Sequence, residues 1–152
     1  MLDVRTVPSD RPPATDFVEA MISEIEPLYG RVDVPGAPTA TPADMAPPGG
    51  GFVVIFDDGV PVAGGGVKRL DDEACEIKRM YVVPEARGRG LGRVLLEGLE
   101  AEARRLGYRL ARLDTGPRQP GAQRMYETAG YRPIENFNSN PFASFWGEKA
   151  LA

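Results

Sequence analysis

Apolar and polar residues follow two periods along the chain, and each change of period predicts a new element. Leu2–Val7 alternates at every second position, which is typical of a half-buried strand. Apolar residues then recur at three- and four-residue spacing. This spacing predicts an amphipathic helix that begins near Ala14–Asp16 and ends around Pro27–Gly30. Its apolar stripe consists of Phe17, Val18, Met21, Ile22, Ile25 and Leu28.

The stretch from Gly30 to Gly51 is rich in proline and glycine and has little periodicity. We expect a long loop here, of a kind that is uncommon in compact domains unless it is mobile or functional. One helical turn is predicted around Pro42–Ala46, with Thr41 as a candidate N-cap. The loop is a candidate to close over a compact pocket.

Three strands are predicted next, at Phe52–Phe56, Val60–Val67 and Ala74–Val83. Short turns rich in aspartate and glycine separate them, so we expect an antiparallel meander. Gly64-Gly65-Gly66 lies inside the second of these strands. Because such a run weakens a strand, it indicates a bulge or the close approach of another backbone.

The second half of the chain alternates helices and strands. A helical apolar stripe ends at Gly107 and is followed by a strand at Arg109–Asp114, which predicts parallel pairing with a right-handed crossover. A shorter helix is predicted at Pro120–Ala129, and strands at Tyr131–Ile134 and Phe145–Leu151. The longer stripe consists of Leu91, Leu95, Leu99, Ala103 and Leu106.

Composition limits the class of protein. The 152 residues are 42% hydrophobic and 26% charged, which is typical of one folded domain, here residues 1–152. A net charge of −4 argues against nucleic acid as a partner. No apolar run reaches the ~20 residues that a membrane helix needs. No signal-peptide pattern opens the chain, so we expect no membrane association.

The chain contains no histidine and one cysteine, Cys75. Without histidine, Ser-His-Asp and Cys-His mechanisms are excluded, and we predict no metal site. A single cysteine forms no internal disulfide and is typical of the cytoplasm, where we expect this protein. Cys75 faces away from Glu76 on the predicted strand, so we interpret it as a small buried hydrophobic residue rather than a nucleophile.

A glycine-rich turn, Arg87–Gly92, joins the longest strand to the helix after it. Its alternate glycines leave backbone N–H groups unshielded. The first turn of a helix also presents unpaired N–H groups and partial positive charge. Three nearby arginines, the last of them Arg93, add full positive charges. The pattern favours a site for a phosphate-bearing ligand; a plain turn with solvated arginines is the alternative.

Two further motifs flank this turn. The turn has the pattern Arg87-x-x-Gly90-x-Gly92. The motif before it is Glu76-Ile77-Lys78-Arg79-Met80-Tyr81-Val82-Val83-Pro84, and the motif after it is Ala122-x-x-x-Tyr126-Glu127-x-x-Gly130-Tyr131. In this order, the motifs resemble those of the GCN5-related N-acetyltransferase (GNAT) superfamily. The resemblance is strong over about Phe52–Tyr131 and rests on element order at the two ends.

The resemblance implies a single-domain α/β acyl-CoA N-acyltransferase fold, with a mixed, bent sheet and helices on both faces. It also implies binding of acetyl-CoA, whose pantetheine arm pairs with the strand before the turn and whose pyrophosphate binds the turn amides. The strand that holds Met80–Val82 and the strand at Leu110–Asp114 should splay apart and form a crevice for this ligand. Gln119 stands where the family often has asparagine. The implied cofactor-binding residues are Met80, Tyr81, Val82, Arg87, Gly88, Arg89, Gly90, Leu91, Gly92, Arg93, Gln119 and Tyr126.

Tyr126 matches the family tyrosine that protonates the departing thiolate, a role that suits a phenol with an unperturbed pKa of about 10. The alternative is that Tyr126 only packs. Glu76 resembles the glutamate that serves as base in histone-type members, and strand alternation places it on one face with Val82, whose N–H would hold the carbonyl oxygen. Lys78, on the same face, is a partner for Glu76, and a water relay or no base is the alternative.

The implied reaction is direct attack of a small-molecule amine on acetyl-CoA in a ternary complex. Three other functions stay open: acetylation of a protein or peptide amine, a catalytically idle acyl-CoA sensor, and a nucleotide-binding protein. Against the last, the glycine turn lacks the Lys-Ser/Thr ending of a P-loop. The sequence names neither the acceptor nor the oligomeric state, and a homodimer that exchanges the last strands is one option.

Overall fold

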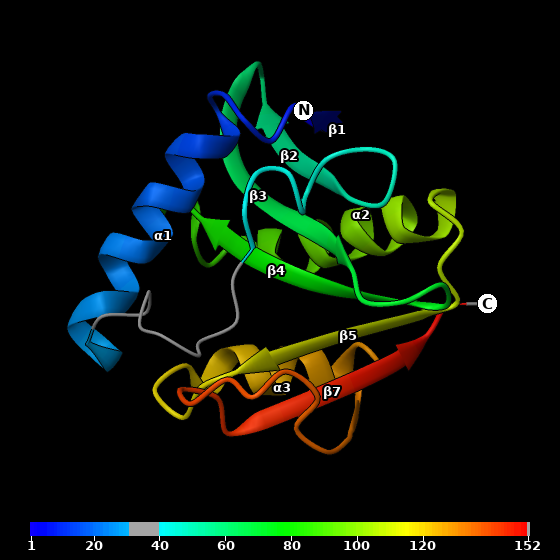
Figure 1. Cartoon of the computed structure of the whole chain (residues 1–152). Coiled ribbons are helices and arrows are strands. Elements are labelled where there is room, and N and C mark those ends of the chain that lie inside the picture. The colour runs from blue at the N-terminus through cyan, green and yellow to red at the C-terminus, as the bar shows by residue number, and fades with distance from the viewer. Residues whose placement is uncertain (31–39, 152) are drawn as a thin grey trace.

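A computed structural model of the chain describes residues 1–30 and 40–151 (Figure 1). The described residues form a seven-stranded sheet in the order β1-β2-β3-β4-β5-β7-β6. The strands are β1 (Leu2–Val7), β2 (Gly51–Asp57), β3 (Val60–Arg69), β4 (Ala74–Val82), β5 (Leu110–Thr115), β6 (Arg132–Pro133) and β7 (Phe145–Ala150). The helices are α1 (Ala14–Tyr29), α2 (Leu91–Arg105), α3 (Pro120–Thr128) and a short 3-10 helix, η1 (Pro84–Ala86).

The predicted order of helices and strands is confirmed, with two differences at short elements. The strand expected at Tyr131–Ile134 shortens to β6, and η1, which was not expected, follows β4. Prolines account for both: Pro133 limits pairing in β6, and Pro84 begins the 3-10 turn.

The sheet is mixed and opens at its centre. β1 to β4 pair antiparallel, and β7 pairs antiparallel with both β5 and β6. β4 and β5 pair in parallel only from Ala74↔Leu110 to Glu76↔Arg112. Beyond Glu76 the two strands separate, as predicted, and Figure 1 shows them diverging.

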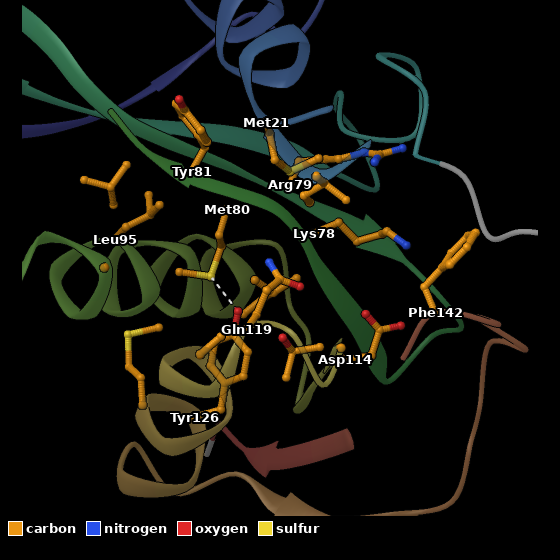
Figure 2. Close-up of a pocket in the computed structure, with 18 of the residues that line it drawn as sticks. Met21, Lys78, Arg79, Met80, Tyr81, Leu95, Asp114, Gln119, Tyr126 and Phe142 are labelled. Carbon is orange, nitrogen blue, oxygen red and sulfur yellow. Dashed lines mark hydrogen bonds between the residues drawn. The ribbon is translucent and has the colours of Figure 1, made fainter. Parts of the chain in front are cut away.

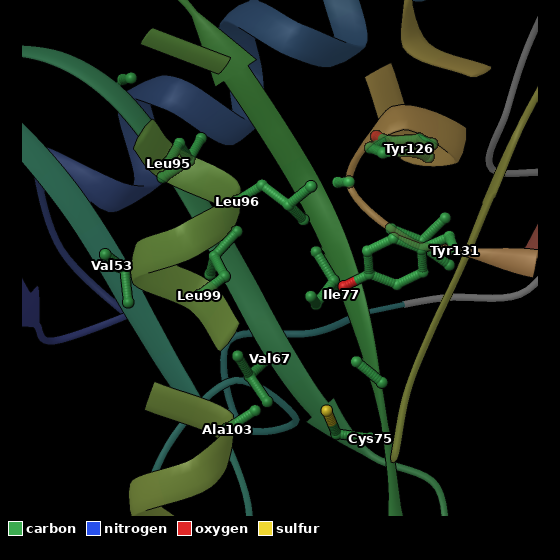
Figure 3. Packing of buried hydrophobic residues seen from close by; sticks show 14 of the residues in the cluster. Val53, Val67, Cys75, Ile77, Leu95, Leu96, Leu99, Ala103, Tyr126 and Tyr131 are labelled. Atoms are coloured by element: carbon green, nitrogen blue, oxygen red, sulfur yellow. The ribbon is translucent and has the colours of Figure 1, made fainter. Parts of the chain in front are cut away.

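Helices cover both faces of the sheet and define two hydrophobic cores. α2 and α3 pack on one face, where the leucines of α2 meet Cys75 and Ile77 of β4 and the ring of Tyr131 (Figure 3). α1 covers the other face together with Met45 from the loop before β2. The sheet is thus buried on both sides around β3 and β4, the strands that lead into the crevice.

The glycine run of β3 allows three close approaches. A Cβ atom at Gly64 would lie 2.7 Å from the Phe17 ring of α1, and one at Gly65 would lie 2.9 Å from Leu99 of α2. A Cβ atom at Gly66 would overlap the Met45 side chain. A register shift also occurs between Gly64 and Gly66. The extra residue at this shift lies in β4, opposite the glycines, so the bulge predicted within the glycine run is in the partner strand instead, and the atoms closest to the added Cβ atoms belong to side chains.

The predicted turn in the long loop is confirmed. The Asp44 N–H donates to the Thr41 hydroxyl at 3.2 Å, and the Thr41 N–H donates to the Asp44 carboxylate at 2.9 Å. These reciprocal bonds form a capping box. Residues 31–39, in the middle of the loop, lie outside the described residues, and so does the predicted closure over a pocket. Among the described residues, no helix has the length and apolar character needed to cross a membrane.

Candidate active site

A cavity of about 290 Å³ lies where β4 and β5 separate (Figure 2). β4 forms one wall through residues 77–82, and α1 contributes the side chains of Met21, Ile25 and Tyr29. The opposite wall comes from the end of β5, from α3 and from the loop before β7. Its lining residues there are Asp114, Thr115, Gly116, Gln119, Ala122, Met125, Tyr126, Asn140 and Phe142.

The bulge in β4 centres on Arg79 and changes which side chains face the cavity. Gly64 pairs with Tyr81 and Gly66 with Lys78, so β4 has one extra residue, and Arg79 has a left-handed φ of 60°. Val82 packs with the α2 core, as Ile77 does, five residues earlier. The expectation that Glu76 and Val82 share a face is therefore wrong, because the bulge reverses the alternation between them.

Glu76 is buried and lies outside the residues that line the cavity. Its side chain is 1% exposed. Its carboxylate pairs with Lys78 Nζ at 3.4 Å and accepts a hydrogen bond from Asn138 Nδ2 at 2.9 Å. Lys78 itself lines the cavity. Glu76 thus holds Lys78 and the loop before β7 in place.

Asp114 is a cavity carboxylate that the sequence reasoning missed. It is half-buried near the end of β5, where its Oδ2 accepts hydrogen bonds from Asn138 at 2.6 Å and Asn140 at 3.1 Å. The indole N–H of Trp146 donates to Asn138 at 3.0 Å and orients that amide. Trp146 therefore supports the site.

The signal that could have found this loop is its alternating asparagines. The side-chain oxygens of Asn136, Asn138 and Asn140 each accept a backbone N–H two residues ahead. Such Asx turns give a loop a defined path. The path brings Asn140 and Phe142 to the cavity.

Tyr126 lies at the end of the cavity nearest α2 and α3. Its side chain is buried, and its hydroxyl contacts Met80 Sδ at 3.7 Å, a weak acceptor (Figure 2). Burial, and secondarily the negative charge of Asp114, raise the pKa of the Tyr126 phenol well above its usual value. The hydroxyl is therefore protonated at neutral pH.

The glycine turn is exposed and has the backbone geometry that an anion site needs. Gly88 and Gly90 have left-handed φ values of 82° and 77°, and Gly90 is the N-cap of α2. A Cβ atom at either position would meet open space. The turn is adjacent to the cavity through Gly92, which lines it. Leu91, in contrast, is buried in the core below the turn.

Two of the three arginines near the turn are already paired with carboxylates. Arg87 contacts Glu24 of α1 at 2.6 Å and stacks over Tyr81, and Arg89 contacts Asp57 at 2.9 Å. These pairs are exposed, so each contributes little to stability and can rearrange.

Gln119 reaches the cavity from the N-cap position of α3. Its Oε1 accepts a hydrogen bond of 3.4 Å from the Tyr29 hydroxyl, which also accepts from the Arg118 N–H at 2.9 Å. The C-terminal end of α1 is thereby attached to the turn before α3. The cavity brings together Met80, Tyr81, Val82, Gly92, Gln119 and Tyr126 of the predicted cofactor-binding set.

Cys75 is fully buried in the α2 core, as predicted. Burial raises the pKa of its thiol to about 12. A thiol that stays protonated at neutral pH is a poor nucleophile. The described residues also contain no group of three or more His, Cys, Asp or Glu side chains that could hold a metal ion.

A split mixed sheet, with a glycine turn leading into a helix beside the split, defines an acyl-CoA N-acyltransferase. The acetyltransferase (GNAT) family matches residues 18–131. The chain is 34% identical over 147 residues to the IAA acetyltransferase of Azospirillum brasilense, covering 91% of this chain and 94% of that protein. The chain belongs to the GNAT family, a family of acetyl-CoA-dependent N-acetyltransferases.

Other relatives match over shorter segments. The N-acetyltransferase YjgM of Escherichia coli is 32% identical over 91 residues, which cover 58% of this chain and 54% of that protein. The chain thus spans about half the length of that relative.

Solved structures confirm the fold. A Klebsiella pneumoniae structure assigned as an acyl-CoA N-acyltransferase superposes with a TM-score of 0.80 at 26% identity, over 100% of this chain and 99% of that one. A GNAT acetyltransferase from Elizabethkingia anophelis, solved with acetyl-CoA bound, superposes with a TM-score of 0.70 at 15% identity, over 98% and 97%. The predicted α/β acyl-CoA N-acyltransferase fold is therefore confirmed.

Proposed function

We propose that this protein transfers the acetyl group of acetyl-CoA to the amine of a small molecule by direct attack in a ternary complex. The observation that carries the proposal is the crevice between β4 and β5, which has both Tyr126 and Asp114 in the wall that faces β4. The fold and the family membership indicate that the acyl donor is acetyl-CoA. The small volume of the cavity favours a compact acceptor over a folded protein surface.

The chain's own residues suit acetyl-CoA binding in two places. Val83 donates its N–H to the Val62 carbonyl on β3. Because successive backbone groups of a strand point to opposite edges, the Val82 N–H points toward the crevice. There it can hold the thioester oxygen and, with its neighbours on β4, pair with the pantetheine arm. The amides of Gly88–Arg93 at the start of α2 bind the pyrophosphate.

In the reaction, the neutral amine attacks the thioester carbon, a C–N bond forms, and the C–S bond breaks. The coenzyme A thiolate leaves with the bonding electron pair and takes the proton of the Tyr126 hydroxyl. The amine loses one proton. Asp114, which lines the cavity, can accept this proton directly or through a water molecule. The role of Glu76 as base stays a prediction, and its burial behind Lys78 favours a positioning role.

A pair of isosteric substitutions separates these two carboxylates. Asp114→Asn is expected to lower kcat/KM for the amine about 100-fold, the scale of a lost general base. Glu76→Gln is expected to leave the shape of the pH–rate profile unchanged, because Glu76 does not touch the acceptor. It should lower stability by about 1–3 kcal/mol, because a buried charged hydrogen bond is weakened. A changed profile in Glu76→Gln, with a normal one in Asp114→Asn, would restore Glu76 as the base.

The proposed function is tested by measuring free coenzyme A released from acetyl-CoA with a panel of small amines, and with peptides as the matched alternative. Amine-dependent release with small acceptors supports the proposal, and release with peptides alone contradicts it. Calorimetry provides the second readout. Tight binding of acetyl-CoA without turnover on any amine would instead support the acyl-CoA sensor.

A further inference from the structure

Arg79 combines the left-handed backbone of the β4 bulge with a side-chain nitrogen that has no partner. Its φ of 60° lies in the left-handed region, which is costly for a side chain other than glycine, asparagine or aspartate. It is the extra residue of the β4 bulge, and its side chain lines the cavity. Strained residues at such positions persist where the surrounding structure holds them, often at ligand sites.

The side chain of Arg79 is half-buried, and its Nε has lost water without gaining a hydrogen-bond partner. Its Nε is buried and has no hydrogen-bond acceptor, and no ion pair joins Arg79 to any carboxylate in residues 1–30 and 40–151. Loss of solvent lowers the pKa of Arg79, although the more distant charges of Glu76 and Asp114 oppose this shift. A buried N–H donor without an acceptor costs free energy. An anionic ligand would supply what is missing.

The other charged side chains that line the cavity, Lys78 and Asp114, already have partners. Lys78 pairs with Glu76, and Asp114 is held by two asparagine amides. Figure 2 shows Lys78 and Arg79 extending from β4 on the side of the cavity where Phe142 lies, away from Tyr126. One anionic site at Asp114 and one cationic site at Arg79 therefore lie in one cavity, beyond the end where the thioester is placed.

We propose that the acceptor carries a carboxylate close to its amine, as an amino acid does. Arg79 binds this carboxylate through its guanidinium, whose planar fork matches the two oxygens. Asp114 receives the ammonium and directs the amine, once deprotonated, toward the thioester. This inference rests on the proposed function and names its substrate class.

The test compares the twenty common L-amino acids with their carboxamides, which keep the amine and the side chain and lose the negative charge. In the wild-type protein, at least one amino acid should be acetylated. Arg79→Gln should lower kcat/KM for that amino acid by about 10- to 100-fold, the scale of hydrogen bonds between charged groups. The same substitution should change kcat/KM for its carboxamide less than about threefold, so the difference isolates the carboxylate contact.

Three controls make the result specific. Arg109→Gln removes an equal charge from an exposed arginine at the far end of β5 and should leave both acceptors unchanged. The affinity of Arg79→Gln for acetyl-CoA, measured by calorimetry, should equal that of the wild type. Its melting temperature should stay equal or rise, because a buried donor without an acceptor is removed; a clear fall would mean that Arg79 has a structural role, and would overturn the inference.

The two proposals fail in different ways. Turnover of amines that lack a carboxylate, with none of any amino acid, overturns the inference and leaves the proposed function standing. If Arg79→Gln lowers kcat/KM equally for the amino acid and its carboxamide, the inference is overturned as well. Failure to release coenzyme A with any amine overturns the proposed function, and the inference with it.

Discussion

Tyr126→Phe is expected to lower kcat by about 100-fold or more while leaving the affinity for acetyl-CoA close to that of the wild type. The substitution removes only the hydroxyl, which contacts the weak acceptor Met80 Sδ and is free to donate a proton to the leaving thiolate. Because burial raises the pKa of this phenol, Tyr126 is neutral throughout the range from about pH 6 to pH 9. The ratio of the wild-type kcat to the kcat of Tyr126→Phe should therefore be constant over that range.

Tyr108→Phe is the matched control for this prediction. Tyr108 is also buried, but its hydroxyl donates to the Gly49 carbonyl, outside the cavity. Its substitution should lower stability by about 1 kcal/mol, the worth of one hydrogen bond, and leave kcat unchanged. Steady-state and single-turnover rates of coenzyme A release would provide the measurement. If Tyr126→Phe keeps more than half of the wild-type kcat, Tyr126 is not the acid.

Gly50→Ala is expected to produce the largest loss of stability, about 3 kcal/mol. A Cβ atom at Gly50 would lie 2.2 Å from the Asp44 carbonyl oxygen and 2.6 Å from that of Val67. Both are backbone atoms, so neither can move without displacing the capped turn or β3. Thermal unfolding should show a melting temperature about 6–12 °C lower, given the size of the chain.

Gly121→Ala makes the same chemical change where space is open. No atom lies within 4 Å of the added methyl group, and Gly121 is in the first turn of α3. The alanine restricts the unfolded chain and favours the helix, so stability should rise by up to about 1 kcal/mol. Equal melting temperatures for the two variants would show that the contacts at Gly50 have no steric importance.

Much of the fold could be predicted because its signals are local. The helices and strands follow from the spacing of apolar residues, and the stripe of α2 alone predicted the face that is buried against the sheet. The glycine turn was also found from sequence, since left-handed φ values at Gly88 and Gly90 are what alternate glycines accommodate at little cost.

The candidate site was predicted less completely because its chemistry depends on pairings between distant segments. Arg87 and Arg89 were expected to surround the turn with free charge, yet their carboxylates come from α1 and β2, 63 and 32 residues away. Asp114 could not be recognised as a cavity residue until the asparagine loop before β7 was seen to fold onto it. The local spacing of apolar and polar residues carries no information about such contacts.

By itself, the sequence determined the order of elements, the glycine turn at the start of α2, the helix that carries Tyr126 and the family. Only the tertiary structure decided which side chains of β4 face the cavity. The reason is the bulge at Arg79, which depends on the pairing of β4 with the glycines of β3 and reverses the alternation between Glu76 and Val82. The alternation of side chains in a regular strand follows from the strand's own backbone. The position of a bulge depends on how the strand pairs with the adjacent strand, which the local sequence does not show.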